Sequence, residues 1–129
     1  MRSALRRALA ALACLWAACC ATDASGLRVT AGDWGNSDAL LVVSEMGATA
    51  FFHCGATGTL TAPLVLDASA HFTVGGTYEL PGAQGSSRSA TYSGVVNFGI
   101  LVLTVRLSDQ TLGPFELHEG ESPMPIACP

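Results

Sequence analysis

Histidines and carboxylates are the side chains of this sequence that could carry out chemistry. The three imidazoles are His53, His71 and His118, and residues 116–119 (ELHE) flank the last of them with two carboxylates. A zinc site needs at least three such ligands to converge, usually two or more imidazoles and a carboxylate. The three histidines fall in separate apolar runs of the chain. We therefore expect isolated, outward-facing histidines, no metal site and no cofactor.

Serine chemistry and phosphate binding are the other activities that the residue types could suggest. No serine stands in the G-x-S-x-G turn that exposes the nucleophile of an α/β-hydrolase. Residues 82–89 (GAQGSSRS) are rich in glycine and serine, but they lack the lysine and the following helix of a phosphate-binding loop. These residues are typical of a flexible hairpin loop, and we expect that the protein is not an enzyme.

Short apolar runs, separated by turn residues, must position any functional side chain. After a first strand that begins at Trp34, the runs are 40–43, 48–54, 64–66, 71–80 (interrupted at Gly75-Gly76), 90–96, 100–107 and 112–119. Glycine, asparagine and aspartate separate them every eight to twelve residues or so, which is typical of antiparallel strands joined by hairpins. About eight short antiparallel strands predict an all-β domain, an up-and-down β-barrel, with a two-sheet β-sandwich as the alternative.

Alternation along the runs predicts which side chains face inward. Leu101, Leu103, Val105 and Leu107 share one face of a strand. Phe52 and Cys54 share a face of an earlier strand. An eight-stranded barrel has room either for its own side chains or for one small apolar ligand. Three aromatic residues are the candidates to line such a pocket or to plug the barrel: Trp34, Tyr92 and Phe115.

The first 24 residues have the features of a targeting signal. Arg2, Arg6 and Arg7 precede an apolar stretch at 8–18 that is rich in alanine and leucine. This stretch has signal-peptide length and is too short to span a bilayer as a helix. We expect residues 1–24 to be a signal peptide or lipoprotein signal, and residues 25–129 to form a single β domain in the periplasm or outside the cell.

The end of the signal decides whether the domain is soluble or anchored. Cleavage after Ala21 or Ala24 would release it, whereas lipid attachment at Cys19 or Cys20 would tether it to a membrane. The residues three positions before these cysteines match the lipoprotein motif poorly. Both outcomes stay open on the sequence.

The domain after the signal is strongly acidic. From Gly26 onward it has nine carboxylates, three arginines and no lysine, which gives a formal charge of −6. Nucleic acids and anionic lipid surfaces repel such a charge, so we expect no nucleic-acid partner.

Two cysteines, Cys54 and Cys128, stand outside the signal. An isolated pair in an oxidising compartment is most simply a disulfide. Closing a loop of about 75 residues would stabilise the domain by about 4 kcal/mol in the chain-entropy account.

Several segments together resemble a widespread type of small exported bacterial β-domain protein. They are DWGN (33–36), GATAFFHCG (47–55), PLVLDASAHFTVGGTY (63–78), TYSGVVN (91–97), LVLTVRLSD (101–109) and GPFEL (113–117). The resemblance implies a compact β domain with Cys54 and Cys128 paired, and it implies no activity or ligand. This chain has Val42, Phe51 and His53 where that type has polar or acidic residues, which predicts an extra apolar patch on the outside.

The functional prediction is a non-catalytic exported β-barrel with a binding or structural role in the cell envelope or outside the cell. We expect a monomer whose partner is a protein or a small apolar ligand. It would contact a membrane only if it is lipidated. The alternative is an envelope inhibitor of a lysozyme or protease. In that case residues 82–89 would make the contact, and the acidic surface would suit a basic partner.

Overall fold

The computed structural model describes residues 27–81 and 86–122. These residues form eight β-strands and one short 3-10 turn. In chain order the elements are β1 (Gly32–Gly35), β2 (Ala39–Val43), β3 (Ala48–Phe52), η1 (His53–Gly55), β4 (Thr57–Leu60), β5 (His71–Glu79), β6 (Arg88–Asn97), β7 (Ile100–Arg106) and β8 (Thr111–Glu119). Within these ranges no helix has the length and apolar character needed to cross a membrane.

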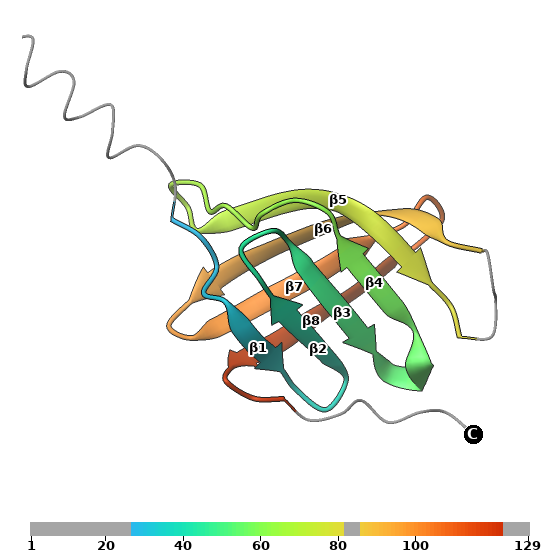
Figure 1. The fold of residues 1–129 in the computed structure, drawn as a ribbon, viewed down its shortest axis with the longest axis horizontal. Helices are drawn as coiled ribbons and strands as arrows, with labels where there is room; N and C mark the ends of the chain where they lie inside the picture. The colour runs from blue at the N-terminus through green and yellow to red at the C-terminus, as the bar shows by residue number, and fades with distance from the viewer. Residues whose placement is uncertain (1–26, 82–85, 123–129) are drawn as a thin grey trace, which may run out of the picture.

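The strands form one closed barrel (Figure 1). Each strand pairs antiparallel with the next, and β8 returns to β1, where Trp34 lies opposite Glu119 and Gly35 opposite His118. This closure confirms the predicted up-and-down barrel and excludes the two-sheet sandwich, whose sheets would have free edges. Because every strand reverses direction, the turns after β2, β4 and β6 lie at one end of the barrel, and those after the odd-numbered strands lie at the other.

The predicted inner faces are confirmed where alternation was strict. In β7, Leu101, Leu103 and Val105 have no exposed surface, and Leu107 beyond it is also buried. Burial of such side chains is the main favourable term in folding. The largest fully buried side chains are Trp34, Tyr92, Leu41, Leu64, Leu101, Leu103, Leu117 and Val105.

The fourth strand differs from the prediction. Residues 64–66 were expected to form a strand, but the strand here is β4, Thr57–Leu60, in which a glycine at an inward position leaves no alternation of apolar side chains. Residues 64–66 instead run along the segment before β1. The Val29 amide donates to the Leu64 carbonyl at 3.0 Å, and the Leu66 amide donates to the Leu27 carbonyl at 2.7 Å. Val29 and Leu64 are both buried, so this pairing extends the core.

Two further strand predictions are corrected. β3 ends at Phe52, and Cys54 lies in η1 with a φ of 70° instead of sharing a strand face with Phe52. β5 runs without a break through Gly75 and Gly76.

Glycines on the inner face make room for aromatic rings. A Cβ at Gly58 would lie 2.0 Å from the Tyr92 Oη, and a Cβ at Gly94 would lie 2.5 Å from the Phe72 Cε1. Each ring occupies space that only glycine leaves free. The barrel interior is therefore filled at these two levels by the protein's own side chains.

Candidate functional site

The three aromatic candidates for a pocket or plug all belong to the interior. Trp34 is 1% exposed, and its Nε1–H donates to the Thr30 carbonyl at 2.9 Å. Tyr92 is fully buried, its Oη donates to the Thr77 carbonyl at 2.6 Å, and burial raises its pKa above the ordinary value of 10.0. Phe115 is half-buried, and its ring centroid lies 5.6 Å from that of Phe52. The polar atoms of Trp34 and Tyr92 thus have partners within the protein.

The histidines come from different parts of the barrel. His53 lies in η1, His71 begins β5, and His118 lies in β8. The His118 Nε2 lies 3.9 Å from the Glu116 Oε1. In residues 27–81 and 86–122 no three His, Cys, Asp or Glu side chains gather closely enough to hold a metal ion.

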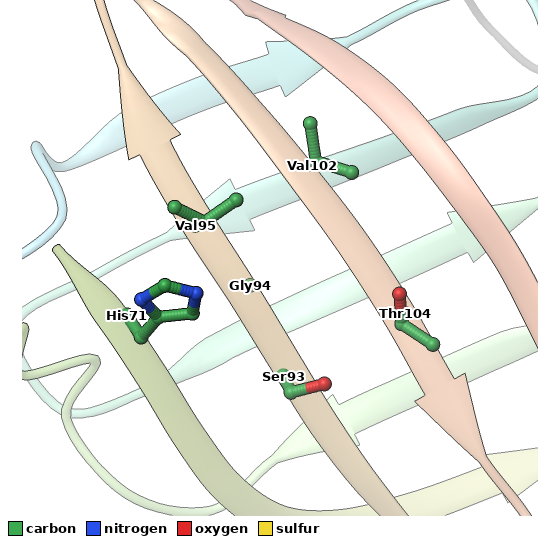
Figure 2. Close-up of a pocket in the computed structure, with 6 residues that line it drawn as sticks. All are labelled: His71, Ser93, Gly94, Val95, Val102 and Thr104. Carbon is green, nitrogen blue, oxygen red and sulfur yellow. The ribbon is translucent and has the colours of Figure 1, made fainter. Parts of the chain in front are cut away.

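A shallow groove of about 190 Å³ crosses the outer face of β5, β6 and β7 (Figure 2). Six residues line it: His71, Ser93, Gly94, Val95, Val102 and Thr104. We call this feature the β5–β7 groove. It is open to solvent and lies on the outside of the closed sheet.

Strand register explains the chemistry of the β5–β7 groove. His71 lies opposite Val95, and Val95 lies opposite Val102, so an imidazole and two valines form one row. Ser93 lies opposite Thr104 and forms a row of hydroxyls beside it. The first row can cover an apolar side chain of a partner, and the second can donate or accept hydrogen bonds.

Because Leu101 and Leu103 share the inner face, alternation puts Val102 and Thr104 on the outer face. It could not bring His71 next to Val95, because these residues are 24 positions apart and only the strand register pairs them. Sequence analysis therefore missed the β5–β7 groove as a unit.

A tight turn positions His71 at the edge of the β5–β7 groove. The Asp67 Oδ1 accepts hydrogen bonds from the Ser69 amide at 2.8 Å and from the His71 amide at 3.0 Å. The His71 Nδ1 lies 3.0 Å from the Ser69 carbonyl oxygen. The hydrogen bonds from the amides of His71 and Ser69 hold the pKa of the Asp67 carboxyl below its ordinary value of 3.8.

The lowered pKa of Asp67 predicts a pH dependence of stability. Because the folded state favours the carboxylate, its contribution is present above pH 3.8 and is lost as the pH falls through the lower folded pKa. Asp67→Asn keeps an oxygen acceptor but no charge, so we expect a smaller loss of unfolding free energy below pH 3.8 than in the wild type. Urea unfolding followed over this pH range measures the slope. An unchanged slope would contradict the role of Asp67.

The loop predicted to contact an enzyme is only partly within the described residues, since residues 82–85 lie outside them. At its far side the Arg88 guanidinium donates to the Asp109 carboxylate. This hydrogen bond holds the pKa of Asp109 below its ordinary value and ties the start of β6 to the turn between β7 and β8. Both side chains are solvent-exposed enough that the pair adds little to stability.

The cysteine predictions fall mostly outside the described residues. Cys54 is half-buried in η1, whereas Cys128, Cys19 and Cys20 lie outside those ranges. Phe51, one residue of the predicted outer apolar patch, is 36% exposed.

The geometry defines the class of the protein: a small, closed, eight-stranded antiparallel barrel with a shallow groove on its outer wall. No family model, curated protein or solved structure matches the chain.

Proposed function

We propose that this protein is an exported, non-catalytic β-barrel that acts as a binding module in the cell envelope or outside the cell. The observation that carries the proposal is the β5–β7 groove, which places an apolar row beside a hydroxyl row on a rigid sheet. Rigid elements hold binding side chains at low entropic cost. The interior also favours a binding site on the outer wall, because Trp34 and Tyr92 occupy the interior and form their hydrogen bonds within the chain.

The lining of the groove suggests the chemistry of the partner. Val95 and Val102 offer apolar surface, while Ser93, Thr104 and His71 offer hydrogen-bonding groups. The groove is shallow, which suits an extended segment of a protein better than a small molecule that must be enclosed. We therefore favour a protein partner that inserts an apolar side chain next to main-chain or side-chain polar groups.

The experiment is native mass spectrometry of the protein isolated from the envelope. We expect a native mass above that of the chain alone, and we expect the additional mass to disappear in the Val102→Glu variant, which puts a charge in the groove. Thr59→Glu, at an exposed position of β4, is the control and should retain the bound partner. A bare native mass for the wild type would remove the support for a binding role.

The acidic surface favours a second candidate, an inhibitor of a lysozyme or protease. After Gly26 the chain has nine carboxylates and three arginines. One of these arginines, Arg88, donates a hydrogen bond to the Asp109 carboxylate. Such a surface attracts basic enzymes. Inhibition of at least one member of a panel of lysozymes and secreted proteases at micromolar concentration is the expected result. An inactive panel would rule out this candidate.

Export, lipidation and the Cys54–Cys128 pairing are parts of the same proposal. The denatured mass of the isolated protein tests all three. Cleavage near residue 24 sets the chain mass, an acyl group on Cys19 or Cys20 adds to it, and a disulfide lowers it by two hydrogens. A mass equal to the full reduced chain would contradict each of these steps.

A further inference from the structure

One end of the barrel presents an unusual set of apolar side chains. Six large apolar residues are exposed in the described part of the chain. Four of them lie at the end that carries the turns after β2, β4 and β6, which we call the even-turn end. These four are Leu27 (80% exposed), Met46 (80%), Val65 (47%) and Phe98 (97%). The other two, Phe51 and Leu80, belong to strand β3 and to the turn after β5.

The topology explains how four distant positions share this end. Met46 is in the turn between β2 and β3, Val65 is in the connection between β4 and β5, and Phe98 is in the turn between β6 and β7. Leu27 lies at the same end because the segment before β1 pairs with the β4–β5 connection. Arg28 and Val65 form an isolated antiparallel β-bridge there. Figure 1 shows the three connections at the same end of the barrel.

Phe98 is held in a conformation that its side chain disfavours. Its φ is 49° and that of Gly99 is 74°, as in two-residue hairpin turns whose central residues both have positive φ. Glycine or asparagine adopts this conformation readily, whereas it is a clear outlier for a bulky residue. The chain therefore accepts backbone strain in order to hold an almost fully exposed aromatic ring at the tip of a hairpin. Strain of this kind is concentrated at functional positions.

The chain outside the described residues points to what covers this end. Leu27, the first described residue, lies at the even-turn end, and the 26 residues before it in the sequence contain three arginines and the apolar stretch 8–18. A lipid attached at Cys20 would be seven residues from Leu27, a distance of at most about 25 Å. An attached lipid would thus join the chain at the end of the barrel where Phe98 and Met46 are exposed.

The arrangement of the side chains fits a lipid surface. They project from separate connections, so each can enter the boundary between headgroups and acyl chains, whereas a protein partner is usually met by a continuous core of contacts. Arg28, Glu45 and Asp67 lie in the segments that meet at this end, and the Glu119 amide donates to the Gly99 carbonyl beside Phe98. Three of these four charged residues are acidic. Anionic lipids would repel this set, and uncharged headgroups would not.

We propose that the even-turn end docks on a phospholipid surface without net charge, with Phe98 and Met46 inserted and Leu27 and Val65 beside them. This interaction is separate from the β5–β7 groove, which lies on the side wall of the barrel. It orients the barrel on a membrane whether or not a lipid is attached, and with an attached lipid it supplies the second contact that stable anchoring needs.

The test uses the full chain, expressed with Cys19→Ser and Cys20→Ser so that no lipid can be attached, and recovered from the host. Binding to phosphatidylcholine vesicles is measured by flotation, and vesicles containing an equal share of phosphatidylglycerol are compared. We expect binding to phosphatidylcholine and weaker binding to the mixed vesicles. Phe98→Asn should lower the partition coefficient at least tenfold, since most of the apolar surface of one large side chain no longer enters the lipid.

Phe98→Asn also relieves the backbone strain, so the variant should fold at least as stably as the wild type, which urea unfolding checks. Leu80→Asn changes an apolar residue at the opposite end that is 48% exposed, and this variant should bind vesicles like the wild type. Absence of vesicle binding, or an equal loss in Leu80→Asn, would overturn the proposal. A Phe98-dependent dimer in sedimentation velocity without vesicle binding would assign this end to self-association instead. Unchanged vesicle binding by Val102→Glu is expected and separates this test from that of the groove.

Discussion

Replacing Gly76 with alanine is expected to lower the free energy of unfolding by about 3 kcal/mol, at the upper end of the range for overpacking. A Cβ at this position would lie 1.9 Å from the Thr59 carbonyl oxygen and 3.2 Å from the Leu60 Cα. Both are backbone atoms of β4 and cannot swing aside. β4 would have to move away from β5, and the pairing between these two strands would lose hydrogen bonds.

Gly75 supplies a matched control for this prediction. It is the neighbouring residue in β5, and a Cβ there would have no atom within 4 Å. Gly75→Ala should therefore leave the unfolding free energy within about 0.5 kcal/mol of the wild type or raise it, since glycine weakens a strand interior. Urea unfolding followed by circular dichroism measures both variants. Equal stabilities would show that β4 and β5 are not held as close as the structure places them.

Replacing Trp34 with alanine should cost about 3–5 kcal/mol, the usual range for removing a large aromatic side chain from a core. Trp34 is almost completely buried, and its indole N–H satisfies the Thr30 carbonyl. A domain of this size has a total stability of about 5–15 kcal/mol, so the variant would lose a large share of it. Denaturant unfolding followed by circular dichroism measures the loss.

Trp34→Phe separates the hydrogen bond from the packing. Phenylalanine retains most of the apolar surface but has no donor for the Thr30 carbonyl, so we expect a smaller loss of about 1–2 kcal/mol. In the wild type, Trp34 is the sole tryptophan after residue 24. Its fluorescence should therefore be blue-shifted and poorly quenched by iodide. Strong quenching, or equal costs for the two substitutions, would contradict the buried position of the ring.

Local patterning was sufficient wherever apolar and polar residues alternated over a long run. β7 shows this most clearly, because Leu101, Leu103 and Val105 stand at every second position and all face the core. Alternation is a property of the extended backbone itself, since successive side chains point to opposite faces. The all-β class and the antiparallel order of most strands followed from such runs and the turn residues between them. The choice of the closed barrel over the two-sheet sandwich came from the pairing of β8 with β1.

Local patterning failed where the inner residues are small. In β4 the inward positions are Gly58 and Leu60. A side chain at position 58 would overlap the Tyr92 side chain, so only glycine fits there. A strand of this kind has no apolar alternation to recognise. Residues 64–66 do have an apolar run, but it packs against the segment before β1, so the run indicated burial without indicating a strand.

The sequence by itself determined the all-β class, the acidic charge, the inward faces of the long strands and the candidate cysteines. Those features depend on composition and on neighbours in the chain. Only the tertiary structure decided that His71 lies beside Val95 and Val102, and that Met46, Val65 and Phe98 share one end of the barrel. The physical reason is strand register and barrel closure, which bring together residues far apart in the chain through pairings that no local pattern encodes.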